Sequence, residues 1–482
     1  MKRFFTIATL PIFAACGSTP EDPTALSEPL AQNISISEIA MLQSLKVPVM
    51  QNGGVADRGD IPLVALRDSV LRVYVAPGDG FSPHTITARA RITTTSPTGS
   101  FAQVFSASAN VSGATVENDL STSINVPIPG VALEPGASVT VVLNDTKGDS
   151  PDTESAARWP EDGSSSDLGV VSGSDRVRVM IVPVEYDADG SGRLPDTSDT
   201  QLEAYRKHFY QLYPTAEVDI TVHDPWPYSS VINGSGAGFA QALTALGQLR
   251  ASDQPDPDVY YYGAFAPASD LASYCGGGCI LGLSPVGAPY SVGIGFFGDM
   301  ATETAVHEVG HAHGRSHAPC GGAASPDPNY PYAGALIGVW GYDPFGPLMI
   351  DPAAYTDMMS YCAPTWISDY HYALLFKRVR TDNQYYNDWM SGSSSRATLP
   401  AYAIAPVEET GDVHVPSTAI REPWITQGAP REITWDGGKA TAYFLPYDHL
   451  PGGVLYVPSG VPAVASVAAL RPGESPRLVV RQ

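Results

Sequence analysis

The chain of 482 residues has few charged side chains, and few of those are basic. Charged residues make up 16% of the sequence and hydrophobic residues 43%, which excludes a highly charged disordered chain. Lys and Arg number 27 against 50 Asp and Glu, so the formal net charge is -23. Because nucleic-acid binding needs a basic surface, we expect no nucleic-acid partner. The sequence gives no indication of the oligomeric state.

The N-terminus has the pattern of an export signal. Lys2 and Arg3 precede the apolar stretch 4–13, which has about the length of a signal-peptide core and is too short to span a bilayer. We therefore expect residues 1–15 to be a signal peptide.

The residues that follow resemble the lipobox of bacterial lipoproteins, in which cleavage leaves a Cys that carries acyl chains. Ala14, Ala15 and Cys16 provide this pattern, and the polar stretch 16–35 is expected to be a tether. Gly17 after the Cys resembles outer-membrane sorting in a Gram-negative cell. We expect an exported protein, anchored at the outer membrane or cell surface through this lipid only. The alternative is an ordinary signal peptide with Cys16 as an incidental thiol.

Cysteine is scarce, with five in the chain, and four remain once Cys16 is assigned to lipid. An even number in an exported chain is typical of two disulfides, although four cysteines allow three pairings and free thiols are the alternative. Cys275 and Cys279 lie in a CGGGC segment and could close on each other. Cys320 and Cys362 would then be partners.

The two ends of the chain read as β-domains. Residues 36–145 contain short alternating runs separated by Gly, Pro, Asn and Asp, which is typical of an antiparallel β-sandwich. Residues 146–174 are rich in Ser, Asp and Gly and are expected to be a linker. Short β-runs return over 392–482, which we expect to be a small C-terminal β-domain.

Between these two regions, residues 175–391 have the sequence pattern of an α/β domain. Residues 177–184 form a near-continuous apolar run, expected of a strand covered on both faces. Strands and helices then alternate, which predicts a mixed, mostly parallel sheet with helices packed on it. The fold class expected for the whole chain is multidomain α+β. The alternating elements are helix 201–212, strand 218–222, helix 239–250 and strand 259–262.

The strongest functional signal is a cluster of His in residues 307–317, which begins with the pattern H-E-x-x-H. On a helix, His307 and His311 are one turn apart and face the same way, so they can bind one zinc ion. Glu308 is placed to take a proton from a zinc-bound water. Gly314 allows the helix to end and the chain to turn, so His317 can become the third ligand. Three protein ligands leave one position open, which is the catalytic arrangement; the alternative is a solvated His cluster.

The extended pattern H-E-x-x-H-x-x-G-x-x-H resembles that of the metzincin zinc metallopeptidases, over about residues 177–389. Metzincins also have a tight turn that carries Met beneath the metal, and residues 357–362 fit it. Of the two Met there we choose Met359, because Tyr361 then lies two residues later. In astacin-like and serralysin-like metzincins, a Tyr at that offset contacts the zinc or the oxyanion. The resemblance implies a zinc endopeptidase with Glu308 as general base and Tyr361 as helper.

Three stretches look more specifically like bacterial lipoprotein metallopeptidases related to secreted mucin-degrading enzymes. The stretches are HAHGRSHAPCGGAASPDP at 311–328, IGVWGYD at 337–343, and 359–370. This resemblance implies protein or glycoprotein substrates, although substrate choice depends on variable loops and accessory domains. A Cys320–Cys362 disulfide would tie the turn at the third ligand to the Met-turn. Metzincins bind peptide along the edge strand before the active helix, here residues 280–283 or 291–297.

Two weaker signals and two other functions complete the predictions. Residues 187–192, with alternating Asp and Gly, resemble part of a Ca²⁺ loop, but Ser198 stands where the twelfth-position Glu belongs. His313 falls off the ligand face, so we expect it to be structural.

The chain could instead be a surface adhesin for glycoproteins that uses the peptidase domain as a scaffold, although an intact Glu308 argues against this. A zinc amidase acting on peptidoglycan peptides is a third candidate.

Overall fold

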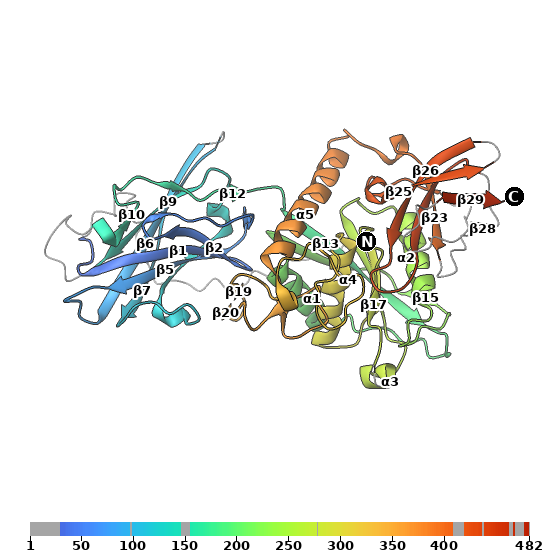
Figure 1. Cartoon of the computed structure of the whole chain (residues 1–482), viewed down its shortest axis with the longest axis horizontal. Helices are drawn as coiled ribbons and strands as arrows, with labels where there is room; N and C mark the ends of the chain where they lie inside the picture. Colours follow the sequence, from blue (N-terminus) through green and yellow to red (C-terminus); the bar gives the residue numbers. More distant parts are fainter. Residues whose placement is uncertain are drawn as a thin grey trace, which may run out of the picture.

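The structure is a computed structural model, and it describes residues 29–96, 99–145, 155–276, 278–407, 419–435, 438–461, 466–467 and 477–481. The predicted signal peptide and Cys16 lie outside these residues. The fold is mixed α+β with several sheets, and Figure 1 shows a sandwich, a middle region that contains the helices, and a C-terminal sheet in a row. No described helix has the length and apolar character that a membrane span requires.

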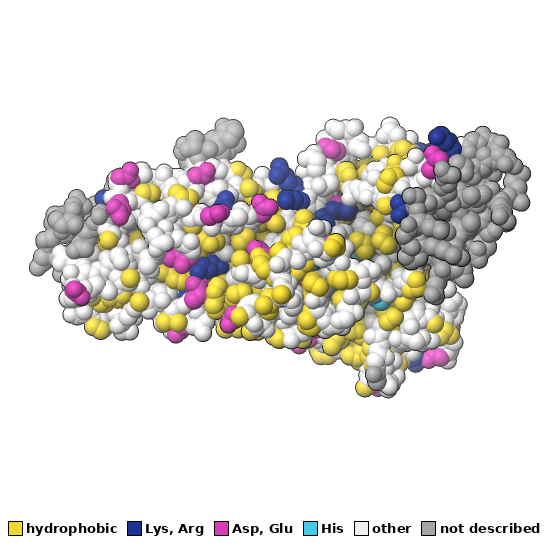
Figure 2. Space-filling view, in the orientation of Figure 1, with side chains coloured by type: hydrophobic (Ala, Val, Ile, Leu, Met, Phe, Trp, Pro, Cys, Tyr) yellow, Lys and Arg dark blue, Asp and Glu magenta, His cyan; other side chains and the backbone are white. Residues whose placement is uncertain are grey.

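The N-terminal region is a sandwich of two antiparallel sheets that share one core. Alternation creates this core: along one strand Ile86, Ala88, Ala90 and Ile92 are buried, while Thr85, Thr87 and Arg91 are more exposed. The first sheet runs β3 (Gly54–Val55), β2 (Lys46–Gln51), β1 (Ile34–Leu42), β5 (Ser69–Pro77) and β8 (Ile124–Ile128). The second runs β10 (Arg158–Trp159), β9 (Ser138–Asn144), β6 (His84–Ser96) and β7 (Gly99–Val111), with β11 (Ser166–Asp167) beside β9. Figure 2 shows acidic side chains scattered over this part, in keeping with the net charge of -23.

The second half of the predicted linker, residues 158–171, belongs to the sandwich instead. Strands β10 and β11 pair with β9, and β12 (Val170–Val171) pairs in parallel with β4 (Leu63–Val64). Trp159 and Leu168 anchor this segment because both are buried in the sandwich core. β10, β11 and β12 are each only two residues long. Strands this short show no alternation of apolar and polar residues, so the sequence pattern could not distinguish them from a linker rich in Ser, Asp and Gly.

The middle region is built on a sheet with strand order β14-β13-β16-β18-β17, and β15 also pairs with β13. Every neighbouring pair is parallel except β17 with β18, which is antiparallel and places β17 at the edge. Ser198 and Ser368 start two of the helices by accepting a backbone N–H with their side chains. The strands are β13 (Arg176–Tyr186), β14 (Glu217–Val222), β15 (Trp226–Tyr228), β16 (Val259–Phe265), β17 (Gly282–Leu283) and β18 (Tyr290–Ile294). The helices are α1 (Asp199–Leu212), α2 (Phe239–Asp253), α3 (Leu271–Cys275), α4 (Asp299–Ala312) and α5 (Asp369–Met390).

A short hairpin (β19 and β20), a short parallel pair (β21 and β22) and a C-terminal sheet follow. Between α4 and α5 lie β19 (Gly341–Asp343), β20 (Leu348–Ile350), β21 (Thr356–Asp357) and β22 (Thr365–Trp366). The C-terminal sheet runs β24 (Ala419–Ile420), β23 (Tyr402–Val407), β27 (Gly453–Pro458), β26 (Gly438–Pro446), β25 (Ala429–Trp435), β29 (Arg477–Arg481) and β28 (Ser466–Val467).

Both β-domains are packed firmly against the middle region. The C-terminal sheet shares a hydrophobic core with it, in which the Tyr290 and Tyr456 hydroxyls lie 2.7 Å apart. On the other side, the fully buried Arg67 of the sandwich donates to the backbone carbonyls of Tyr210, Tyr213 and Thr215.

Candidate metal centre

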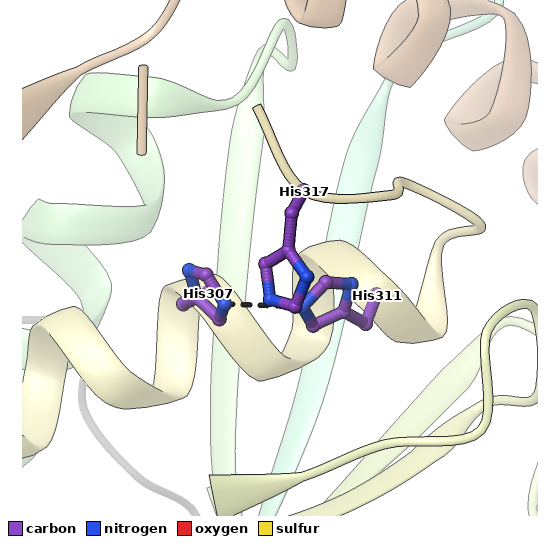
Figure 3. A group of neighbouring side chains, drawn as sticks. All are labelled: His307, His311 and His317. Carbon is purple, nitrogen blue, oxygen red and sulfur yellow. Dashed lines mark hydrogen bonds between the residues drawn. The ribbon is translucent and has the colours of Figure 1, made fainter. Parts of the chain in front are cut away.

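Helix α4 and the turn after it bring three imidazoles together. His307 and His311 lie one turn apart on α4, and Gly314 has a positive φ of 83° where the chain leaves the helix. The chain then returns, and His317 faces the other two rings, as Figure 3 shows. The Nε2 atom of His311 lies 3.0 Å from that of His307 and 3.1 Å from that of His317.

Backbone carbonyls fix which nitrogen of each ring carries the proton. The Nδ1 atoms of His307, His311 and His317 lie 2.8, 2.6 and 2.6 Å from the carbonyl oxygens of Met358, Arg315 and Ala324. A carbonyl only accepts, so each Nδ1 is the donor and each Nε2 keeps its lone pair.

Three lone pairs that converge in this way repel one another unless a cation lies between them. Donors at 2.0–2.1 Å around a tetrahedral zinc ion are about 3.3 Å apart, close to the distances between the Nε2 atoms. Burial, and then the neighbouring His317, lowers the pKa of His307 to about 4, so its ring is neutral near pH 7 as a metal ligand must be. The donor set fits zinc.

Glu308 lies beside these rings with one oxygen unengaged. Its side chain packs on the edge strand so closely that a Cβ at Gly282 would lie 2.5 Å from Oε1. The Oε2 atom is buried and has no hydrogen-bond partner. Burial, and then the charge of Asp448, raises the pKa of Glu308 well above its usual value. A raised pKa suits a group that must both accept and return a proton.

A cavity of about 510 Å³ opens in front of Glu308. Its size is in the range of small-molecule sites, and it is large enough for one or two side chains of a peptide. Its walls come from the edge strand, α4, the Met-containing turn and one residue of the C-terminal sheet; among them are Gly282, His307, Glu308, Tyr361 and His449.

The Met-containing turn lies under α4, and both Met take part in it. The Met359 side chain is fully buried, and its Sδ would lie 2.6 Å from a Cβ at Gly310, so a larger residue there would displace this side chain. Met358 contributes its carbonyl, which accepts from His307. Asp357 fixes the turn by accepting from the backbone N–H of Met359 at 2.7 Å.

A buried His that the sequence analysis did not single out supports this turn. His371 of α5 donates from Nδ1 to Asp357 at 2.8 Å, and both side chains are fully buried. The backbone N–H of Ser368 donates to the second oxygen of Asp357 at 2.9 Å. The start of α5 thus holds the loop under the histidines.

Tyr361 lies on the cavity wall, about half exposed, with its ring centroid 4.8 Å from that of His317. Next to it, Cys362 is joined to Cys320, which ties the turn after His317 to the Met-containing turn. Cys275 and Cys279 form the other disulfide, so the predicted pairing is confirmed.

His313 has the structural role expected of it. Its Nδ1 donates to the carbonyl of Val309 at 2.8 Å, and its ring stacks on Tyr260 at a centroid distance of 3.8 Å. It therefore faces the core rather than the other three imidazoles.

The predicted Ca²⁺ loop forms a turn that closes on itself. Asp189 pairs with Arg193, and the backbone of Tyr186 bridges to Arg193 across the turn. Among the described residues, the side-chain groups placed to hold an ion are found around His317 and not in this turn.

Two residues that the sequence analysis did not predict reach the histidines from the C-terminal sheet. Asp448 is fully buried, and its Oδ2 lies 3.6 Å from Nε2 of His311 and accepts from Nδ1 of His449. Ligand atoms of His317, Asp448 and His449 all lie within 4.8 Å of one another. No local pattern marks this pair, since a single Asp-His in a β-hairpin has no metal-binding spacing.

The structure also distinguishes the two predicted substrate strands. β17 lies at the edge of the sheet, whereas β18, which covers most of residues 291–297, is paired on both sides. Of the two predicted strands, therefore, only the one in segment 280–283 lies at a sheet edge.

Residues 286–399 match the family model Peptidase M66. This segment contains the three His, Glu308, Met359, Tyr361 and the Cys320–Cys362 disulfide, so the chain is a metallopeptidase. The match covers less than half of the chain and stops before the hairpin that carries Asp448. No curated protein matches the chain.

Proposed function

We propose that this metallopeptidase is a zinc-dependent endopeptidase of the metzincin type, anchored at the cell surface. The observation that carries the proposal is the convergence of three unprotonated Nε2 atoms beside Glu308, whose Oε2 is buried without a partner. A scaffold for an adhesin would need neither a buried carboxylate nor an open cavity in front of it.

His307, His311 and His317 would hold the zinc ion. When bound, zinc supplies a Lewis acid that lowers the pKa of a bound water toward 7. Glu308 accepts the proton of the attacking water at Oε2 and returns it to the leaving amine. Tyr361 donates a hydrogen bond from its hydroxyl to the oxyanion that develops on the peptide carbonyl.

The substrate backbone adds as a strand to the edge at residues 280–283. Main-chain pairing of this kind tolerates many sequences, because every peptide offers the same N–H and C=O groups. Preference for particular side chains comes from the cavity, whose walls include Met300, Val306 and Tyr361.

Export, lipid attachment at Cys16 and glycoprotein substrates complete the proposal. Their support is the N-terminal pattern of residues 1–17 and the resemblance of residues 311–370 to lipoprotein metallopeptidases. Disulfides at Cys275–Cys279 and Cys320–Cys362 are in keeping with an oxidising compartment.

The test is cleavage of plain and O-glycosylated proteins by the soluble chain that lacks residues 1–16, beside its Glu308→Ala variant. Wild-type protein should cleave, and the variant should bind zinc equally well but lose activity by a factor of about 100 to 10,000, the range for general-base catalysis. The two panels of substrates report whether glycans are required.

Absence of cleavage by a folded, zinc-loaded wild-type chain would contradict the proposal and favour the adhesin. Equal cleavage by the Glu308→Ala variant would assign the activity to another group or to a contaminant.

A further inference from the structure

A hairpin of the C-terminal sheet extends the edge of the middle sheet next to the histidines. Strand β26 ends at Pro446 and β27 begins at Gly453, so residues 447–452 form the tip. Pro446 accepts from the backbone N–H of Val286, and Tyr447 bridges to Pro285. The tip therefore lies against the segment that directly follows β17.

These contacts give the Asp448 carboxylate a fixed direction. The backbone N–H of Asp448 donates to the carbonyl of Ser284 at 3.1 Å, and the N–H of Ser284 donates back to Oδ1 of Asp448 at 2.9 Å. His449 donates from Nδ1 to the other oxygen, Oδ2. A carboxylate has about four lone-pair positions, so Oδ2 retains one for a further partner.

The atom that Oδ2 faces is not a donor. Nε2 of His311 lies 3.6 Å away and carries no proton, because Nδ1 of the same ring donates to the carbonyl of Arg315. A carboxylate oxygen and an imidazole lone pair at this distance repel each other. Two such acceptors lie stably together in a buried site only when a cation is between them.

The distance from Asp448 to His311 fits a shared ion. Adjacent oxygen and nitrogen ligands of one five-coordinate zinc ion, at 2.0–2.2 Å and 2.0–2.1 Å, are about 2.9–3.7 Å apart. The 3.6 Å from Asp448 to His311 lies in this range, as do the 3.0 and 3.1 Å between the imidazoles.

The hairpin cannot swing away easily, because the whole sheet is locked to the middle region. Tyr456 on β27 meets Tyr290 on β18 inside a common core, and buried Arg250 on α2 lies 3.4 Å from buried Glu422. Gly452 closes the tip at a positive φ of 104°, where a Cβ would lie 2.1 Å from the carbonyl oxygen of Val407.

We propose that Asp448 is a fourth protein ligand of the ion held by His307, His311 and His317, oriented by Ser284 and His449, and that a five-coordinate ion keeps the remaining position open for water. The C-terminal β-domain is then part of the metal site rather than an appendage. The inference rests on the proposed zinc site but concerns metal binding alone, so it can be tested without a substrate.

The test compares Asp448→Asn with wild type in the soluble chain that lacks residues 1–16, which retains every described residue. Asn preserves the oxygen that accepts from Ser284 but is a poor zinc ligand. Zinc affinity, measured by competition with a chromogenic chelator, should fall at least about tenfold, the lower end of the loss seen when supporting groups of a zinc site are mutated. The visible absorption of the Co²⁺-substituted protein should change in intensity, because it reports the number and type of ligands.

Glu422→Gln is the matched control, since it removes another buried carboxylate of the same domain, one that pairs with Arg250 and Arg396. It should leave zinc affinity and the Co²⁺ spectrum unchanged. If Asp448→Asn is folded and keeps both wild-type values, or if Glu422→Gln loses affinity to the same extent, the proposal is wrong.

The two proposals fail separately. Loss of zinc affinity in Asp448→Asn supports the fourth ligand even if no protein is cleaved by wild type. Cleavage that depends on Glu308, together with unchanged zinc affinity in Asp448→Asn, supports the endopeptidase and overturns the fourth ligand.

Discussion

The two β-domains pack against the same middle region, yet only the C-terminal one reaches the histidines. The sandwich contacts the far side through Arg67 and through Ser44, whose carbonyl accepts from Trp366, and it supplies none of the described residues that line the cavity. The C-terminal sheet places His449 in the cavity wall and Asp448 beside His311. A hydrophobic core shared with the middle region is therefore not enough to show whether a β-domain only supports the histidine site or also contributes residues to it.

The comparison predicts that stability and metal affinity respond to different contacts. Interface substitutions on the sandwich side should reduce the free energy of unfolding and leave the zinc affinity of the folded protein unchanged. On the C-terminal side, the same separation should hold for every residue except those that orient Asp448.

Arg67→Ala should have the largest effect on stability. It leaves the buried carbonyls of Tyr213 and Thr215, the partly buried carbonyl of Tyr210 and the Ser44 hydroxyl without their donor, at about 1–3 kcal/mol each, so we expect a loss of about 5 kcal/mol. Denaturant titration measures this loss, and Arg67→Lys should retain part of the stability because one ammonium replaces some of the bonds. If Arg67→Ala lowered zinc affinity as much as we expect for Asp448→Asn, the sandwich would also influence the metal site, and the difference between the two β-domains would not hold.

Removal of the Cys320–Cys362 disulfide tests a contact that should affect both quantities. The bond spans 42 residues, so the chain-entropy model gives a loss of about 4 kcal/mol in the double Ser variant. Zinc affinity should also fall, because the bond joins the turn that carries His317 to the turn that holds His307.

The Cys275–Cys279 bond is the matched control. It spans four residues, for which the same model gives about 2 kcal/mol. Its double Ser variant should keep wild-type zinc affinity, and equal losses of affinity in the two variants would show that the disulfide near the site has no special role.

The part of the site that could be predicted from sequence is the part that is contiguous. Glu308 and the three His lie within eleven residues. Helix periodicity places His307 and His311 on one face, and the turn at Gly314 explains how His317 returns to them. The Met-containing turn could be found because the family resemblance supplied its form. The parallel sheet was visible as alternating strands and helices, since each of these elements is long enough to show its period.

The rest depends on contacts that no local pattern contains. Asp448 meets His311 only because residues 446–448 at the hairpin tip pair along residues 284–286, and that register is set by the shared core rather than by the hairpin itself. The same holds for His371, which reaches Asp357 from the first turn of α5. Residues 158–171 were assigned to a linker because two-residue strands carry no alternation.

The smallest effect expected here comes from the hydroxyl pair that joins the C-terminal sheet to β18. Tyr290 and Tyr456 are both buried, and their hydroxyls lie 2.7 Å apart. Replacing either by Phe leaves the other hydroxyl buried without its partner, which should reduce the free energy of unfolding by about 1–2 kcal/mol. The double Phe variant removes both polar groups and should be closer to wild type than the sum of the single losses, so a double-mutant cycle measures the coupling.

Zinc affinity should stay unchanged in all three variants, because Ser284 and not the tyrosine pair fixes the Asp448 carboxylate. Additive losses would show that the hydroxyls act independently, and a parallel loss of zinc affinity would show that the position of Asp448 depends on the whole interface.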